Sequence, residues 1–591
     1  MTTRHDVVGL MRCWARPLAA LLIAAGALAG AGRNRSEAQD VLTLDFAYGS
    51  EKKAWIDEVT AQYNAANHKV GGKRIKVNPV DLGSGELIDE VISGGRKAHL
   101  VSPASRVYIE LGNARWRKDS RSGGKDLVGK TENLVVSPVV IAMWRPMAEA
   151  LGWPTKEIGW GDVLKLARDP KGGWASIGHA QFGSFKLGHT HPEYSNSGLI
   201  SLLAEAYAGA DKKDDLTVAD VMKPETVEFV RGIERSVVHY GSSTGTFAKA
   251  MFTNGPTYLS AAVLYESSVV ESYDRKKYPP TNGFDRDEWP VVAIYPKEGS
   301  FYSDHPIGVV ERPEWVTDEH RAAAADYIAH LRAPEQQVKA IDSGFRPALE
   351  LDDLKAKLAT RLNKEHGVDP DLAQFRDLPV PDNDVMRAIR EDLWPKCKKH
   401  ARLVLVLDVS GSMGAPAEKL VNAKRGAQEA VKFLGDDDLI SVMRFSSQPD
   451  WIAQDLPAKD GRQAAQDKIR VLIPGGETAM YDAVKLAHQL LQQNPRSDMI
   501  QAVVLLGDGA NNISGGERVR TPVQNKALLD QLIEQIRVDS EQKTTRVYTI
   551  YYGADADKAT MKRIADETKA ESFEGNPATI LKVFKKIMEN F

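Results

Sequence analysis

The chain has 591 residues, which is too long for a single hydrophobic core and predicts two to four domains. Its composition is that of a soluble globular protein, since 42% of the residues are hydrophobic and 27% are charged. The net charge is −3 and no long stretch is dominated by basic residues, so we expect no nucleic-acid partner. Beyond Cys13 in the amino-terminal segment, Cys397 stands alone, which excludes an intramolecular disulfide and a cysteine-based zinc site there.

The first 38 residues have the layout of an export signal. Three arginines precede an uncharged, apolar run over residues 17–32, which is short for a membrane span of about 20 residues. Small residues suit cleavage after Ala38 or near Ala31. The segment therefore predicts export to the periplasm or the cell envelope. An uncleaved signal anchor that holds the protein at the membrane is the alternative.

Residues 41–345 alternate between strand and helix patterns. This order predicts a parallel sheet covered by helices. A longer apolar strand at 133–144 is expected to cross between two lobes. A connector rich in charge and proline follows over 346–400. The other strand patterns lie at 41–47, 75–82, 99–102, 291–295 and 307–310, and the helix patterns at 51–64, 86–93 and 318–331.

Three features of the sequence indicate a protein family for residues 41–345. They are the strand–Gly-Ser–helix openings, the segment Ser102-Pro103-Ala104-Ser105 and the export signal. This unit resembles the type 2, two-lobed periplasmic solute-binding proteins of bacteria. The resemblance implies a small-molecule or oxyanion ligand in a cleft between the lobes, held by hydroxyls and by backbone amides at helix starts. A carboxylate or a sugar remains open as well. The candidate ligand-binding residues are Ser50, Ser84, Ser105, Ser137, Ser195, Ser197 and Glu266, and for each serine a plain N-cap role is the alternative.

The segment His189–Ser197 carries two histidines and an acidic residue at alternating positions, His189, His191 and Glu193. Such residues suggest a metal site. They fall, however, in a stretch rich in proline and serine rather than on a regular helix. We interpret the segment as a surface or cleft loop.

A second domain is predicted over residues 401–591. The apolar run Arg402–Leu407 is typical of a central parallel strand, and it ends in Asp408-Val409-Ser410-Gly411-Ser412 before a helix at 416–434. The loop therefore lies at the carboxyl end of a strand, where open α/β sheets bind their ligands. Gly411 permits a tight bend that leaves the side chains of 408, 410 and 412 on one side.

Two later segments have the same strand–loop–helix placement. Thr478 precedes a helix at 479–493, and Asp508 follows a strand at 499–506. Here the sequence resembles the von Willebrand factor A family, whose metal-ion-dependent adhesion site combines a DxSxS motif with a Thr and an Asp from two later loops. The last loop reads Gly-Asp-Gly where the family often has Thr-Asp-Gly, which leaves the ligand intact. The resemblance implies a metal site formed by Asp408, Ser410, Ser412, Thr478 and Asp508.

Three hydroxyls and two carboxylates form a donor set of oxygens alone. Mg²⁺ is a hard cation that takes about six oxygens, so it is the expected metal, with Mn²⁺ or Ca²⁺ as alternatives. The set contains no His or Cys, which argues against zinc or copper. In the family one coordination position is left for water or for a partner's carboxylate.

The remaining alternation predicts a doubly wound, mostly parallel, Rossmann-like sheet. Further strands are expected at 438–445, 499–506 and 545–551, and further helices at 460–472, 479–493, 523–537, 556–569 and 577–590.

These features favour a non-enzymatic, exported binding protein of the cell envelope. In this hypothesis the metal site engages a protein partner through an acidic side chain, beside a solute-binding-like module. The alternative is the substrate-binding component of a transport system with a regulatory von Willebrand factor A domain. A third hypothesis is a subunit of metal-chelatase machinery, but that machinery is cytoplasmic and the export signal argues against it.

Overall fold

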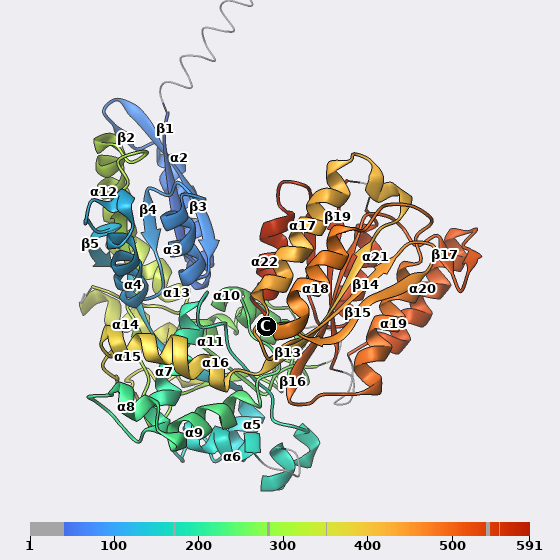
Figure 1. The fold of residues 1–591 in the computed structure, drawn as a ribbon. Coiled ribbons are helices and arrows are strands. Elements are labelled where there is room, and N and C mark those ends of the chain that lie inside the picture. Colours follow the sequence, from blue (N-terminus) through green and yellow to red (C-terminus); the bar gives the residue numbers. More distant parts are fainter. Residues whose placement is uncertain (1–40, 169–172, 280–283, 350–351, 539–543, 555) are drawn as a thin grey trace, which may run out of the picture.

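The computed structural model describes residues 41–168, 173–279, 284–349, 352–538, 544–554 and 556–591. They form two lobes in the amino-terminal half and one sheet domain in the carboxy-terminal part (Figure 1). The predicted export signal, residues 1–38, lies outside the described residues. Within the described ranges, no helix combines the length and the apolar character needed to cross a membrane.

Lobe 1 is built on a six-stranded sheet with the order β2-β3-β1-β4-β11-β5. The predicted parallel arrangement of the first strands is confirmed, because β1 pairs in parallel with both β3 and β4. The later strand β11 runs antiparallel to β4 and β5. The strands are β1 (Val41–Gly49), β2 (Lys69–Val70), β3 (Lys73–Leu82), β4 (Leu100–Ser102), β5 (Val128–Asn133) and β11 (Pro306–Val310). The helices are α2 (Lys53–Ala66), α3 (Ser84–Ser93), α4 (Arg106–Arg117), α12 (Asp318–Arg332) and α13 (Pro334–Asp342).

The chain crosses between the lobes where the long apolar strand was predicted. That segment divides at Leu134: β5 belongs to the lobe 1 sheet, and β6 (Val135–Trp144) belongs to the lobe 2 sheet. The chain returns to lobe 1 through Asp304 and His305, between β10 and β11. The two crossings lie side by side, because the amide of Leu134 donates to the carbonyl of His305 at 3.1 Å.

Lobe 2 has the strand order β10-β6-β8-β7, and β9 and β12 also pair with β6. Its strands are β7 (Leu187–Gly188), β8 (Ala261–Tyr265), β9 (Val291–Ile294), β10 (Tyr302–Ser303) and β12 (Arg346–Pro347). Its helices are α5 (Arg145–Ala150), α6 (Trp160–Arg168), α7 (Asn196–Gly209), α8 (Val218–Val221), α9 (Pro224–Glu234), α10 (Thr244–Asn254) and α11 (Glu266–Glu271). The connector adds α14 (Asp352–Arg361), α15 (Asn383–Arg387), the π-helical turn η6 (Ala388–Leu393) and α16 (Trp394–Cys397).

The carboxy-terminal domain has a six-stranded sheet with the order β15-β14-β13-β16-β19-β20, which is 3-2-1-4-5-6 in the domain's own chain order. Every pairing is parallel except that of the edge strand β15, so the predicted doubly wound sheet is confirmed. In such a sheet the strand order reverses between the first and fourth strands, and a crevice opens at their carboxyl ends. The strands are β13 (His400–Asp408), β14 (Leu439–Phe445), β15 (Pro449–Pro457), β16 (Met499–Gly507), β19 (Arg546–Tyr552) and β20 (Ser572–Gly575), with a small hairpin of β17 (Ile513–Ser514) and β18 (Glu517–Arg518).

Helices cover both faces of this sheet because successive strand residues point to opposite sides. In β13, Leu403 and Leu405 join the hydrophobic cluster that includes the helices α17, α18 and α22, whereas Val404 and Val406 join the cluster on the other face, with α19, α20 and α21. The helices are α17 (Glu418–Phe433), α18 (Ala458–Arg470), α19 (Met480–Gln493), α20 (Pro522–Ile536), α21 (Lys558–Glu567) and α22 (Ile580–Met588).

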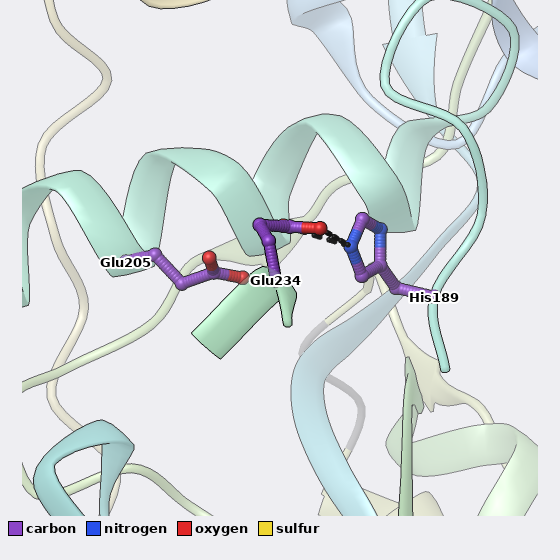
Figure 2. Close-up of side chains that lie close together, drawn as sticks. All are labelled: His189, Glu205 and Glu234. Carbon is purple, nitrogen blue, oxygen red and sulfur yellow. Dashed lines mark hydrogen bonds and ion pairs between the residues drawn. The ribbon is translucent and has the colours of Figure 1, made fainter. Parts of the chain in front are cut away.

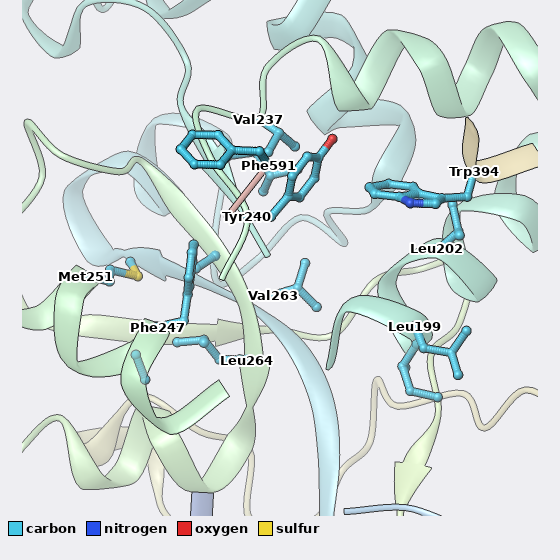
Figure 3. Close-up of a cluster of buried hydrophobic side chains, with 14 of the residues drawn as sticks. Leu199, Leu202, Val237, Tyr240, Phe247, Met251, Val263, Leu264, Trp394 and Phe591 are labelled. Carbon is cyan, nitrogen blue, oxygen red and sulfur yellow. The ribbon is translucent and has the colours of Figure 1, made fainter. Parts of the chain in front are cut away.

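The carboxy-terminal domain packs directly on lobe 2. Phe591, Tyr240 and Trp394 belong to one buried cluster (Figure 3). Backbone hydrogen bonding continues across the same junction, since the amide of Tyr240 donates to the carbonyl of Asn590 at 3.2 Å. The amide of Lys399, just before β13, donates to the Tyr240 hydroxyl at 2.9 Å. The two halves therefore share a continuous hydrophobic core.

Candidate metal centre and cleft

The five predicted metal ligands meet at the carboxyl edge of the carboxy-terminal sheet. Asp408 ends β13, and Asp508 follows β16 directly, so the two carboxylates flank the point where the strand order reverses. Ser410 and Ser412 lie in the loop around the 3-10 turn η7 (Gly411–Gly414), and Thr478 lies just before α19. We call these five residues the strand-end site.

Oxygens of Ser410, Ser412 and Asp508 lie within contact distance in the strand-end site. The hydroxyls of Ser410 and Ser412 are 3.0 Å apart, and the Ser412 hydroxyl donates to Asp508 Oδ1 at 2.7 Å. A Cβ built on Gly509 would lie 3.8 Å from Ser412 Oγ and 3.9 Å from Thr478 Oγ1, so both hydroxyls border the same small space. Six oxygens at the Mg²⁺ bond length define octahedral edges of about 2.9 Å. The oxygen spacing of the strand-end site therefore fits a small hard cation.

Backbone hydrogen bonds tie the three loops together. The amide of Gly411 donates to the carbonyl of Gly476 at 3.1 Å, and the amide of Gly475 donates to Val409 at 2.8 Å. The Thr478 amide donates to Asn512 Oδ1 at 2.7 Å. Gly476 has a φ of +86°, and a Cβ there would meet Ser447 Oγ at 2.8 Å, so the loop requires glycine at this position. The side chains of the site are thus held by loops that brace one another.

The carboxylates of the site are buried, whereas one edge faces solvent. Asp408 and Asp508 are each 1% exposed, but Ser412 is exposed. The amide of Ser410 donates to Asp408 Oδ1 at 2.8 Å. Burial raises the pKa of Asp408 to about 7, and the neighbouring charge of Asp508 acts in the same direction. Burial deprives these carboxylates of water. A cation that reached the site from the Ser412 side would stabilise their negative charge in its place.

Lys419 is a further member of the site that the sequence analysis missed. Its ammonium group forms an ion pair with Asp508 Oδ2, and the Tyr552 hydroxyl donates to the Lys419 carbonyl at 3.0 Å. The residue lies in the first turn of α17. The one signal that could have identified it is general: a buried carboxylate needs a cationic partner. Two buried carboxylates facing one ammonium leave negative charge that a divalent cation can balance.

In the amino-terminal half, the three serines predicted on lobe 1 accept hydrogen bonds from backbone amides. Ser50 Oγ accepts from Gly245 of lobe 2 at 3.0 Å, which ties the lobes together. Ser84 Oγ accepts from Ala104 at 3.0 Å, and Ser105 caps α4 by accepting from Val107 at 3.3 Å. Ser105 is thus an N-cap, the alternative considered for it.

The other predicted cleft residues are also engaged with the protein. Ser137 Oγ accepts from the amide of Ser267 at 3.1 Å. The hydroxyls of Ser195 and Ser197 lie 3.2 and 2.8 Å from Thr244 Oγ1. Glu266 forms an ion pair with Arg346 at 2.8 Å. All seven candidates are buried, and they are distributed over both lobes. Ser50, Ser195 and Ser197 meet at Thr244 and Gly245, at the start of α10.

Polar groups that the sequence analysis did not single out lie at the junction of the lobes. Lys52 Nζ is 2.6 Å from Glu51 Oε1 and 3.3 Å from Nδ1 of His305. Asn196 donates to the Tyr265 hydroxyl at 3.1 Å, and the rings of Tyr265 and His305 are 5.5 Å apart. Among the described residues, Asn196 Oδ1 and His305 Nε2 are buried with no hydrogen-bond partner.

The segment His189–Ser197 lies between the lobes. The carbonyl of Tyr194 accepts from Gly85 at 2.9 Å, and the carbonyl of Pro192 accepts from the Tyr108 hydroxyl at 2.9 Å. The interpretation as a cleft loop therefore holds, but it is not a surface loop, because both histidines are buried. His189 contacts Glu234 rather than Glu193, a partner that the local spacing could not reveal.

Two family models match separate parts of the chain. Residues 403–511 match the von Willebrand factor type A domain, and residues 135–360 match the bacterial extracellular solute-binding proteins. The chain joins a solute-binding domain to a von Willebrand factor type A (VWA) domain. No curated protein sequence matches the chain.

Solved structures resemble each half at low sequence identity. The sulfate-binding protein SubI from Mycobacterium tuberculosis is 18% identical over 54% of this chain and 89% of its own, with a TM-score of 0.34. The binding protein AfuA from Actinobacillus pleuropneumoniae is 13% identical over 61% of this chain and 99% of its own, with a TM-score of 0.37. A von Willebrand factor type A protein from Catenulispora acidiphila is 21% identical over 32% of this chain and 42% of its own, with a TM-score of 0.27.

Proposed function

We propose that this protein is an exported, non-enzymatic binding protein of the bacterial cell envelope, whose VWA domain engages a protein partner through Mg²⁺. One observation carries the proposal: five side-chain oxygen donors from three separate loops converge at the strand order reversal. Asp408, Ser410, Ser412, Thr478 and Asp508 would hold the ion. Bound there, Mg²⁺ would supply a positive centre that attracts an acidic side chain of the partner.

The protein's own residues determine how a partner would approach. Asp408 and Asp508 lie at the bottom of the site, and Ser412 lies at its exposed edge. A carboxylate of a partner would therefore enter from the Ser412 side. The solute-binding domain would hold a small molecule between its lobes, where Asn196 Oδ1 and His305 Nε2 lack protein partners among the described residues.

Isothermal titration of the full chain with Mg²⁺ tests the metal claim. We expect saturable binding that Asp408→Asn abolishes, because the substitution removes a charged ligand and keeps the side-chain shape. Envelope proteins retained on the immobilised chain should be released by EDTA and should not bind the Asp408→Asn chain. If Mg²⁺ and Mn²⁺ both fail to bind the unmodified chain, the proposal is wrong.

A transport role is the second candidate, and the solute-binding family match over residues 135–360 favours it. The protein would then deliver a solute to a permease, and the VWA domain would regulate this delivery. Uptake assays in a deletion strain distinguish the two functions. Suppose that deletion abolishes solute uptake and that the Asp408→Asn chain restores it fully. The protein then acts in transport, and this role does not require metal-dependent binding of a partner.

A further inference from the structure

Lobe 2 contains a second group of ligand-type side chains, separate from the strand-end site. His189 follows β7, Glu205 lies on α7 and Glu234 ends α9. Figure 2 shows the Glu234 carboxylate between the other two side chains. All three residues are 0% exposed, and one donor atom from each lies within 4.8 Å of the others. We call these three residues the lobe 2 cluster.

The ring of His189 directs its second nitrogen at a carboxylate. His189 Nδ1 lies 2.8 Å from the carbonyl of Thr190, which can only accept, so Nδ1 carries a hydrogen. The other nitrogen, Nε2, faces Glu234 Oε1 at 3.0 Å and Oε2 at 3.3 Å. Nε2 and the carboxylate therefore share either a proton, which makes the ring an imidazolium, or a cation. Histidines that bind metals commonly donate their second N–H to a backbone carbonyl in this way.

Glu205 provides the second, independent sign of a ligand. Its Oε1 accepts from Ser201 Oγ at 2.7 Å, but its Oε2 is buried and has no hydrogen-bond partner among the described residues. The adjacent Glu234 accepts from the Tyr240 hydroxyl at 2.9 Å. Glu205 Oε2 is satisfied either by a proton shared with Glu234 or by a bound cation.

We propose that His189, Glu205 and Glu234 form a second metal site, which binds a divalent transition-metal ion such as Zn²⁺. One imidazole and two carboxylates suit a cation of this class, whereas Mg²⁺ and Ca²⁺ prefer oxygen ligands alone. The exchange balances in charge and in protons. Without metal, one proton on His189 Nε2 and one on Glu205 neutralise the cluster; a divalent ion displaces both protons and leaves the net charge at zero.

The position of the cluster gives the site a structural role. His189 begins the loop that contacts lobe 1 through Tyr194. On the other side, Glu234 accepts from Tyr240, whose hydroxyl also accepts from the amide of Lys399 at the entrance to β13. A bound ion would therefore fix the cleft loop and the start of the VWA domain to the same point.

Metal content measures the proposal directly. The full chain carrying Asp408→Asn and Asp508→Asn, which disable the strand-end site, is purified after expression with Zn²⁺ or Mg²⁺ and dialysed against a mild chelator. We expect about one Zn²⁺ per chain and no Mg²⁺, with loss of at least tenfold in Zn²⁺ content for His189→Gln and for Glu205→Gln. His191→Gln is the matched control, since this buried histidine lies outside the cluster, and it should retain the metal.

A spectroscopic readout avoids any dependence on how the variants fold. Pulsed electron paramagnetic resonance of Mn²⁺ added to the unmodified chain should detect nitrogen coupling from His189, which the all-oxygen strand-end site cannot produce. Zn²⁺ content below a tenth of an equivalent in the disabled chain, or a Mn²⁺ spectrum without nitrogen coupling, overturns the proposal. In that case the cluster holds two protons and no metal.

Discussion

Lys419 and a metal ion would compete for the same carboxylate. Asp508 accepts from Ser412 through one oxygen and from the Lys419 ammonium through the other. In the metal-free site the ammonium offsets charge that would otherwise be buried without a partner. A cation bound at the strand-end site would take over part of this role, so Lys419 would stabilise the metal-free protein and weaken metal binding.

Lys419→Met is therefore expected to have opposite effects on stability and on metal affinity. Removing one partner of a buried ion pair should destabilise the metal-free chain by about 3 kcal/mol. Mg²⁺ affinity should increase, because Asp508 no longer has a competing cation. Chemical unfolding with and without Mg²⁺ measures both effects, and Lys432→Met, which breaks a surface pair on the same helix, is the control. A weaker Mg²⁺ affinity in Lys419→Met would contradict this account.

Asp408→Asn tests the other carboxylate through stability. Mg²⁺ at 100 times its dissociation constant should stabilise the unmodified chain by about 2.7 kcal/mol. The variant should unfold at a lower temperature than the unmodified chain only when Mg²⁺ is present. Differential scanning fluorimetry across a Mg²⁺ series shows this directly. An equal loss of stability with and without Mg²⁺ would instead assign Asp408 a purely structural role.

At the scale of elements, the central strands of the VWA sheet could be predicted from the sequence, whereas its edge strands could not. The apolar run before Asp408 forms the central strand β13, buried along nearly its whole length. The edge strand β15, in contrast, is mostly half-exposed and shows no clean alternation, so no strand was predicted over Pro449–Pro457. The short edge strand β20 was missed for the same reason. Edge strands bury too little surface to impose a pattern on the sequence.

The ligand residues divide along a similar line. The residues of the strand-end site could be predicted because each follows a recognisable strand end or loop motif. Lys419 and Glu234 carry no local signal of these roles, because Asp508 and His189 come from distant parts of the chain. Only tertiary packing brings His189 and Glu234 together, since they are 45 positions apart in the sequence.

The end of α22 gives the molecule a pH-sensitive contact. Burial raises the pKa of Glu589 to about 8, and the charge of Glu86 on α3 acts in the same direction. A carboxyl group whose folded-state pKa exceeds its ordinary value binds a proton more tightly when folded. Its contribution to stability is therefore complete at low pH and is lost as pH rises towards 8.

We expect the thermal unfolding temperature to fall between pH 6 and pH 9, and Glu589→Gln to remove the part of this fall due to Glu589. Calorimetry at several pH values measures the difference. The exposed Glu574 provides the control variant Glu574→Gln, which should follow the unmodified chain. A Glu589→Gln chain with an unchanged pH dependence would contradict the assignment.

At the scale of the whole molecule, the junction of the two halves depends on aromatic packing. Phe591 is 4% exposed and lies near Tyr240 in the cluster of Figure 3. Phe591→Ala should weaken the junction by about 3 kcal/mol, the usual loss for a buried aromatic side chain. We expect a larger radius of gyration in solution scattering and faster proteolysis near Lys398. Phe433→Ala, at a half-exposed aromatic on α17, should leave both unchanged.

Helix α22 touches both lobes of the solute-binding domain. Lys582 forms an ion pair with Glu90 of lobe 1 at 3.2 Å, and the Lys585 ammonium lies 5.7 Å from the ring centre of Tyr194 on the cleft loop. The same helix packs closely on α17, where Gly426 makes room for the ring of Phe584. Any change in the angle between the lobes must alter contacts of this helix. Consider a solute that favours one angle between the lobes and a partner that favours one position of α22. Each would then change the affinity for the other by the same factor. Two binding events on opposite halves of the molecule would form one coupled equilibrium.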